Sequence, residues 1–143
     1  MSATEDTEPQ RYTGYLIRRA QQRHVAAWAR LVSTETTSVQ FAVLTVLERL
    51  GGCSQQQLCG AVDLDRSTIA DLVARMERRA LLTRQRDPDD RRRNLTVLTA
   101  EGRAELERLR PGVEAVEREL TGQLEGPERD ALRAGLRRLL DAS

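Results

Sequence analysis

Arginine is the side chain in this sequence that offers the clearest chemistry. Residues 84–93 hold five arginines against three aspartates, and residues 9–34 hold five arginines and no acidic residue. A guanidinium stays charged at physiological pH and its planar fork matches phosphate oxygens, so these stretches favour a phosphate-rich partner. The formal net charge of the chain is only +1, so the signal is local and does not come from the overall charge.

The residues that catalysis or metal binding would need are scarce. The chain has no lysine, which excludes Schiff-base and P-loop lysine chemistry, and His24 is its one histidine. A single histidine cannot anchor a recognisable catalytic triad, and without a cluster of cysteines or carboxylates it is poor material for a metal site. We therefore expect a protein that is not an enzyme and that uses no metal and no cofactor.

The cysteines and the N-terminus indicate the compartment. Cys53 and Cys59 do not form a CxxC motif, and a redox switch would need an exposed thiol with a lowered pKa. No signal-peptide core is present, and no apolar run approaches the ~18 residues of a membrane span. We expect a cytoplasmic protein with reduced cysteines and no membrane contact, in which residues 1–11 form a disordered tail.

Residues 54–99 organise the chain. Ser54 and Asp65 are good N-caps for two successive helices. The second helix has an apolar stripe at helical spacing, made of Ile69, Leu72, Val73 and Met76. Residues 82–86 and 95–98 then predict two strands joined by a charged tip. This order of helix, turn, helix and basic ribbon is typical of a winged helix-turn-helix, in which one helix enters the major groove of DNA.

Further helices flank this pattern. Residues 12–32 predict a long helix that is apolar over more than one face, and residues 37–50 predict a buried helix that begins at a capping box. Residues 103–124 and 126–140 predict two helices whose alternating Glu and Arg form solvated faces around an apolar seam. Only 3% of the residues are aromatic, so the core must be aliphatic. The expected fold class is mainly α with a small β-wing.

Several segments, in register with one another, resemble a known family. They are Leu64–Thr68, Leu72–Val73, Arg75–Glu77, Leu81, Asp87–Arg92, Leu95 and Leu98–Gly102. Together they resemble the multiple-antibiotic-resistance regulator (MarR) family, and the likeness covers roughly residues 12–140. It implies a single domain over residues 12–143, with the winged helix-turn-helix at 37–99 and dimerisation helices at 12–36 and 100–143.

The resemblance also implies partners. It implies a homodimer that binds palindromic operator duplexes, usually to repress nearby genes, and that a small aromatic or phenolic acid releases. We predict DNA contacts from two sets of residues. The set on the second helix is Arg66, Ser67, Thr68, Asp71 and Arg75, and the set on the wing is Arg84, Arg86, Asp90, Arg91 and Arg92. Asp90 is expected to orient Arg92 or to pair with an arginine of the second helix.

The first helix holds the candidate effector site. Its residues are Tyr15, Arg19, His24 and Trp28, with Arg18 as an alternative to Arg19. Packing at a subunit interface is the other interpretation of His24 and Trp28, because a lone histidine and tryptophan on such a helix are commonly structural.

Two positions depart from the family pattern. Ala80 stands where glycine is usual after the second helix, and a positive φ there would strain alanine by about 1 kcal/mol. Asp71 stands where arginine is common, so it faces DNA poorly unless it pairs with Arg75 or accepts a hydrogen bond from a cytosine amino group. Two alternatives therefore remain. One is a dimeric adaptor for ligand or protein that has lost DNA binding, and the other is a thiol redox-sensing regulator that uses Cys53 or Cys59.

Overall fold

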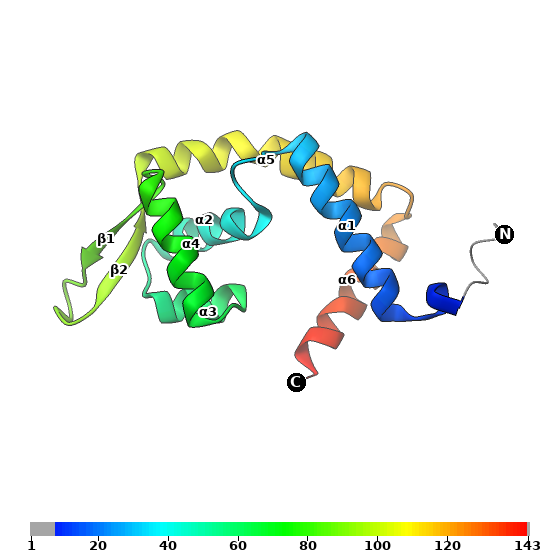
Figure 1. Ribbon diagram of the computed structural model, residues 1–143, viewed down its shortest axis with the longest axis horizontal. Helices are drawn as coiled ribbons and strands as arrows, with labels where there is room; N and C mark the ends of the chain where they lie inside the picture. The colour runs from blue at the N-terminus through cyan, green and yellow to red at the C-terminus, as the bar shows by residue number, and fades with distance from the viewer. Residues whose placement is uncertain (1–7, 143) are drawn as a thin grey trace. The chain divides into compact units, whose positions relative to one another are not determined.

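A computed structural model of the chain describes residues 8–142 (Figure 1). Their contacts form two compact units, which we call the central unit, residues 33–111, and the terminal unit, residues 8–32 and 112–142. The elements in chain order are η1 (Glu8–Arg11), α1 (Thr13–Leu31), α2 (Ser38–Leu50), α3 (Gln55–Val62), α4 (Arg66–Arg78), β1 (Leu82–Arg86), β2 (Asn94–Leu98), α5 (Ala100–Thr121) and α6 (Gly126–Asp141).

In the central unit, α2 and α3 both begin at capping boxes, as the sequence predicts. The Thr37 hydroxyl accepts a hydrogen bond from the backbone N–H of Gln40 at 3.2 Å, and the Gln40 side chain accepts from the backbone N–H of Thr37 at 3.1 Å. Ser54 and Gln57 repeat the arrangement at 3.1 and 2.8 Å. These reciprocal bonds satisfy backbone N–H groups that the first turn of a helix leaves unpaired.

The core of the central unit is aliphatic, as expected. One face of each helix and the base of the two-stranded sheet contribute to it. Its buried side chains include Val43, Leu44, Leu47, Leu58, Ile69, Val73, Met76, Leu82, Leu98, Leu106 and Leu109. The α4 members of this set are spaced three or four residues apart, so burying them leaves the opposite side of α4 exposed.

The wing is an antiparallel pair whose register runs from Leu82 opposite Leu98 to Arg86 opposite Asn94. Its base is anchored, because Leu82 and Leu98 are buried and the backbones of Cys53 and Thr96 exchange two hydrogen bonds of 3.1 and 2.7 Å. Its far end is polar and exposed. Both predicted strands are confirmed, and the second begins one residue earlier than predicted, at Asn94.

The junction between the wing and α5 is tightly packed. The Thr99 hydroxyl caps α5 by accepting from the backbone N–H of Gly102 at 2.9 Å, and it donates to the carbonyl oxygen of Ala80 at 2.6 Å. A Cβ atom on Gly102 would overlap the carbonyl oxygen of Leu81. Glycine is therefore required here by the close approach of two backbones.

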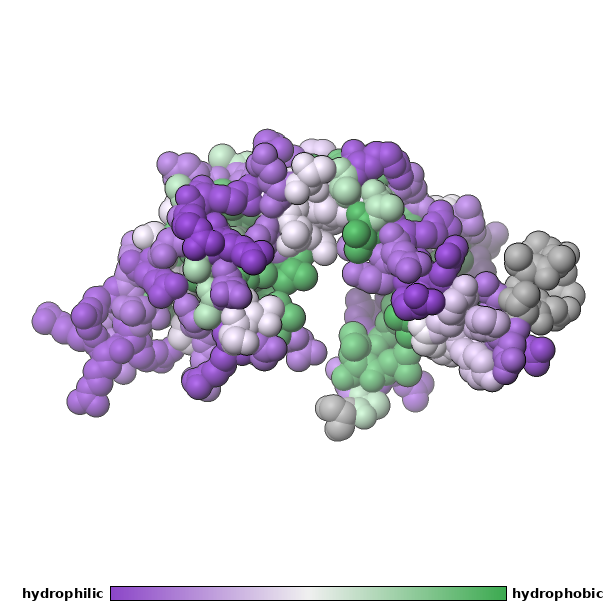
Figure 2. Space-filling view, viewed as in Figure 1, coloured by the Kyte–Doolittle hydropathy of each residue, from purple (hydrophilic) through white to green (hydrophobic). Residues whose placement is uncertain are grey.

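In the terminal unit, α1 packs on the C-terminal half of α5. A Cβ atom on Gly112 would overlap the carbonyl oxygen of Leu31, and Arg30 forms a 2.6 Å ion pair with Glu119. Arg133 of α6 pairs with Glu117. No residue of α6 is buried within this chain, and Figure 2 shows hydrophobic residues gathered over α6.

Two boundaries differ from the sequence predictions. The prediction of a disordered tail over residues 1–11 is wrong for Glu8–Arg11, which form the short helix η1. The rest of that segment lies outside the described residues. The central unit extends beyond the predicted segment 37–99 because the side chains of Thr36 and Glu105 are buried and hydrogen-bonded to each other at 2.8 Å. Within residues 8–142, no helix is both long and apolar enough to cross a membrane.

Candidate nucleic-acid interface

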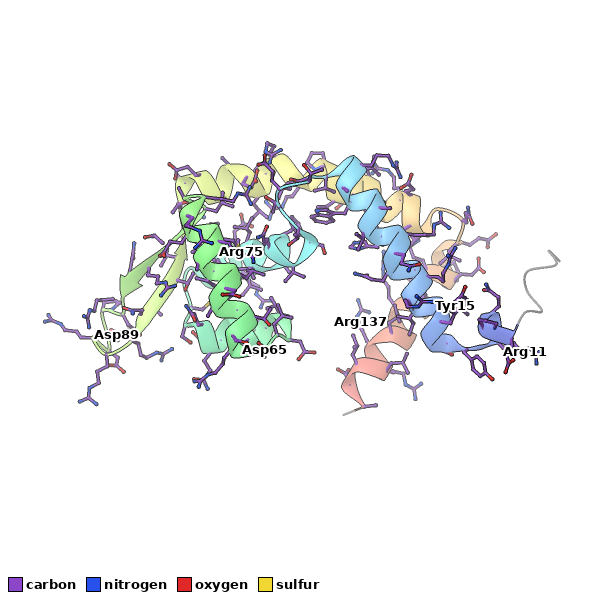
Figure 3. All side chains as sticks on the ribbon, viewed as in Figure 1. Arg11, Tyr15, Asp65, Arg75, Asp89 and Arg137 are labelled. Atoms are coloured by element: carbon purple, nitrogen blue, oxygen red, sulfur yellow. The ribbon has the colours of Figure 1, made fainter. Side chains whose placement is uncertain are left out.

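The exposed side of α4 is polar and lies opposite its buried stripe. Ile69, Val73 and Met76 are fully buried, so the helix is fixed by one face only. Exposed residues occupy the rest of the helix surface, and they include all five that the sequence predicted there, Arg66, Ser67, Thr68, Asp71 and Arg75. Figure 3 shows Asp65 at the start of α4 and Arg75 further along it.

Asp65 caps α4 and also fixes the hydroxyl of Ser67. Its carboxylate accepts from the backbone N–H of Thr68 at 2.8 Å and from the Ser67 hydroxyl at 3.0 Å. The pKa of Asp65 is lowered. The largest cause is the hydrogen bond from the Thr68 backbone, followed by interactions with the side chains of Thr68 and Ser67. The cap predicted from sequence is confirmed, and it has a second effect that the sequence did not show.

The C-terminal half of the exposed face is basic. Arg75 and Arg78 are exposed there, and Arg78 was absent from the predicted set although it falls on the same side of the helix. Of the two conditions under which Asp71 could face DNA, the pairing with Arg75 is not met, because the structure shows neither an ion pair nor a side-chain hydrogen bond for Asp71 within residues 8–142.

The wing tip, residues 87–93, presents arginines on an ordered backbone. The Asp90 carboxylate accepts from the backbone N–H of Arg92 at 3.0 Å, and the Asp87 backbone N–H donates to the carbonyl oxygen of Arg93 at 3.0 Å. Among the described residues, the guanidinium groups of Arg91, Arg92 and Arg93 have no ion-pair partner. Their charge is therefore available to a ligand.

Asp90 thus organises the turn that carries Arg92, which matches one of its two predicted roles. The other role is wrong, because no ion pair joins Asp90 to an arginine of α4 in the part of the chain that the structure describes.

The two strand arginines are already engaged. Arg84 lies 3.5 Å from Glu77 of α4, and both side chains are about half exposed, so this pair links the wing to the helix. The guanidinium of Arg86 donates to the carbonyl oxygen of Arg91 across the tip. Both arginines reach the surface, but Arg84 already has a carboxylate partner and Arg86 a carbonyl partner.

A polar cluster holds the C-terminal end of α4, and it joins the buried side chains of Thr36 and Glu105 to the more exposed Arg79 and Arg108. Arg79 donates to the Thr36 hydroxyl at 2.9 Å and to Glu105 at 3.0 Å, and Arg108 pairs with the same carboxylate. Burial raises the pKa of Glu105, but the hydrogen bonds from Thr36 and Arg108 and the two positive charges outweigh it, so the net pKa is lowered. Sequence analysis missed this cluster.

The four candidate effector residues of α1 divide into two groups. The His24 and Trp28 rings lie 5.9 Å apart. On the other side, the guanidinium of Arg18, the alternative candidate, lies over the Tyr15 ring at 5.4 Å, and Arg19, one turn after Tyr15, is exposed. Residues 15 and 24 are nine positions apart, which turns a helix by about 900°, or half a turn beyond two full turns. Tyr15 and His24 therefore point to opposite sides of α1, and the four side chains do not converge from one copy of this helix.

The thiols lie in different environments. Cys53 is fully buried, and burial raises the pKa of its thiol. Cys59 is partly exposed on α3. A raised pKa disfavours the reactive thiolate at Cys53.

Comparison with known proteins identifies the family. The model of the MarR family matches residues 36–93, which contain α2, α3, α4, the first wing strand and the wing tip. The chain is 34% identical to the HTH-type transcriptional repressor NicR of Pseudomonas putida, over 99% of this chain and 92% of that protein. The chain belongs to the MarR family.

Solved structures of MarR-type regulators agree with this assignment. The PcaV transcriptional regulator of Streptomyces coelicolor, solved in complex with its natural ligand, matches with a TM-score of 0.89 and 39% identity over 99% of both chains. BpsR of Bordetella bronchiseptica, whose DNA binding is regulated by 6-hydroxynicotinic acid, matches with a TM-score of 0.79 and 37% identity, over 88% of this chain and 96% of that one. This MarR-family chain is thus a DNA-binding transcriptional regulator with the winged helix-turn-helix fold.

Proposed function

We propose that this MarR-family protein is a cytoplasmic homodimeric repressor that binds a palindromic operator near its own gene. In each subunit α4 lies in the major groove and the wing tip reaches the neighbouring groove. The observation that carries the proposal is the division of α4 into a fully buried apolar stripe and an exposed polar face, because this leaves the polar face available to base edges and phosphates.

The wing supports the same interpretation. Arg91, Arg92 and Arg93 lie at the tip, and among the described residues none of them has an ion-pair partner. Arg92 is the best candidate for a groove contact, because the Asp90 carboxylate holds its backbone N–H. A planar guanidinium fits a narrow, electronegative minor groove. Phosphate contacts from these arginines supply affinity, and the exposed face of α4 supplies the choice of sequence.

The exposed apolar surface of the terminal unit supports dimerisation. Its large exposed hydrophobic residues are Tyr12, Leu16, Ile17, Val25, Leu132, Leu136, Leu139 and Leu140. They lie on the segments that the family resemblance assigns to dimerisation, and a second copy of the same segments would cover them. Binding to one side of a B-form duplex requires that such a dimer hold its two α4 helices about 34 Å apart, which is one helical turn.

A small aromatic acid is the proposed effector. MarR-family relatives include one solved with its natural ligand and one regulated by 6-hydroxynicotinic acid. On α1, the arginines next to Tyr15 offer a cation for a carboxylate, and the His24–Trp28 pair offers an aromatic surface. Nδ1 of His24 is buried and has no hydrogen-bond partner, which leaves one polar atom available to a ligand.

The test of the proposed function is a gel-shift titration against the gene's own upstream region at two or more salt concentrations. Arg92→Ala should weaken binding to every sequence and reduce the slope of log K against log salt by about 1, because one phosphate contact is lost. Arg118→Ala, which removes an exposed arginine of α5 outside the central unit, is the matched control and should leave both unchanged. If Arg92→Ala keeps the wild-type slope, the wing does not contact DNA.

The same titration separates the alternatives. A protein that binds no upstream fragment at low salt would be the adaptor that has lost DNA binding. A redox-sensing regulator would lose its oxidant response in the Cys53→Ser, Cys59→Ser double variant. The burial of Cys53 favours the repressor that does not depend on its thiols.

A further inference from the structure

The hydroxyl of Ser67 has a fixed hydrogen-bonding polarity. Its oxygen lies 3.0 Å from a carboxylate oxygen of Asp65. An ionised carboxylate only accepts hydrogen bonds, so the proton of the hydroxyl is directed at Asp65. What Ser67 presents outward is therefore the lone pairs of its oxygen, and the side chain acts as an acceptor toward a ligand.

A second acceptor follows on the same side of α4. Asp71 comes four residues after Ser67, so the two side chains lie within about 40° of each other around the axis and about 6 Å apart along it. Asp71 is exposed, and no arginine of the described residues neutralises it. A carboxylate is repelled by phosphates, which means that it has no favourable contact with the DNA backbone at this point.

In the major groove, only two of the four bases present a hydrogen-bond donor that these two acceptors could bind. Cytosine presents its N4 amino group there and adenine its N6 amino group, whereas the edges of guanine and thymine present acceptor oxygens at the equivalent positions. An acceptor held against an acceptor is left unpaired and repelled, so the wrong base is rejected as well as the right one bound.

We infer that Ser67 and Asp71 form an acceptor pair that requires cytosine or adenine at the operator positions facing the N-terminal half of α4. The inference rests on the proposed function, since it assumes that α4 lies in the major groove. Arg75 and Arg78, further along the same exposed side, supply the donors that guanine or phosphate needs. Each half-site should therefore change from amino-bearing bases at one end of α4 to guanine or phosphate contacts at the other.

The first step of the test is selection of bound duplexes from a randomised pool with the full-length protein. Wild type should enrich cytosine or adenine at one or two adjacent positions of each half-site. Asp71→Ala should lose that preference at one position and Ser67→Ala at another. Glu101→Ala, which removes an exposed carboxylate from α5 and leaves α4 and the wing intact, is the control and should keep the wild-type preference.

The second step places a methyl group on the amino nitrogen of the selected base. N4-methylcytosine and N6-methyladenine keep the base pair but replace the amino hydrogen that faces the major groove. Wild type should bind the methylated operator about tenfold more weakly, and Asp71→Ala should show no loss at the Asp71 position. Equal melting temperatures of the variants would confirm that the fold is unchanged.

Two outcomes contradict the inference and are distinguishable. If the protein selects a specific operator but shows neither the base preference nor the methylation effect, the acceptor pair does not read bases and the proposed function stands. If Ser67→Ala weakened binding equally for all sequences, the inference would also fail and the proposed function would stand, because an equal loss of affinity indicates a phosphate contact. If wild type selects no sequence at all, the proposed function fails and the inference fails with it.

Discussion

Ala80 holds a backbone conformation that alanine adopts at a cost, so Ala80→Gly should stabilise the protein. Its φ is 61°, and it ends α4 with two hydrogen bonds. The Ala80 N–H donates to the carbonyl oxygen of Glu77 at 2.9 Å, and the Leu81 N–H donates to that of Met76 at 3.1 Å. This is the Schellman arrangement, in which the left-handed position is usually glycine.

The magnitude follows from two opposing terms. The left-handed conformation costs an L-residue about 1–2 kcal/mol, and glycine in the unfolded chain loses about 0.4–1 kcal/mol more conformational entropy on folding. The difference is a gain of about 1 kcal/mol for Ala80→Gly. For a chain of 143 residues, this corresponds to a rise in melting temperature of about 3 °C.

Urea unfolding followed by circular dichroism, at one protein concentration for all variants, would measure the change. Ala70→Gly is the matched control, since it makes the same chemical change at an exposed position inside α4, where glycine should cost about 1 kcal/mol. The two variants should therefore shift the midpoint in opposite directions. If Ala80→Gly destabilises the protein as Ala70→Gly does, the strain at Ala80 is not real.

Three further predictions follow from named contacts. The lowered pKa of Glu105 means that its cluster stabilises the fold above the ordinary glutamate pKa of about 4.3 and that this contribution is lost as pH falls from there through the lower folded value; Glu105→Gln should therefore lower the free energy of unfolding at pH 7 and reduce its decrease as pH falls below about 4.3, measured by urea titration. Asp65→Ala should cost about 1 kcal/mol through loss of the cap, whereas Asp65→Ser should recover most of it in the same unfolding assay. Leu140→Glu should shift the protein to monomers in sedimentation equilibrium, because a charge would be buried at the proposed dimer contact, and Leu50→Glu on the central unit should not; a dimer that survives Leu140→Glu would place the subunit contact elsewhere.

The elements predicted best were those that short-range chemistry decides. The Thr37 and Ser54 capping boxes and the Asp65 cap depend on residues three positions apart, and the wing strands are neighbours in the sequence joined by a short tip. The structure confirms all of them. The sequence also drew attention to Ala80, because the family pattern usually has glycine there. It did not predict a positive φ, but it predicted the strain that a positive φ would cause. Local sequence was sufficient wherever the interaction itself is local.

The misses have a different origin. Arg79 meets Glu105 across 26 residues and Thr36 across 43, and no periodicity connects such positions, so the polar cluster could not be seen in the sequence. The separation of the effector candidates on α1 has the opposite origin. The half-turn between Tyr15 and His24 was present in the residue numbers and follows from helical geometry alone, so their separation was predictable.

The contacts that hold α4 explain how one helix can be rigid and still carry an unusual reading surface. Asp65 fixes its first turn, Ile69, Val73 and Met76 fix its buried face, and Arg79 fixes its last turn through Glu105. None of these contacts uses the side of the helix that bears Asp71. If α4 reads bases as we propose, a substitution such as arginine to aspartate on the exposed face should alter which bases are favoured at the cost of helix propensity alone, about 0.5 kcal/mol, because no packing contact is lost.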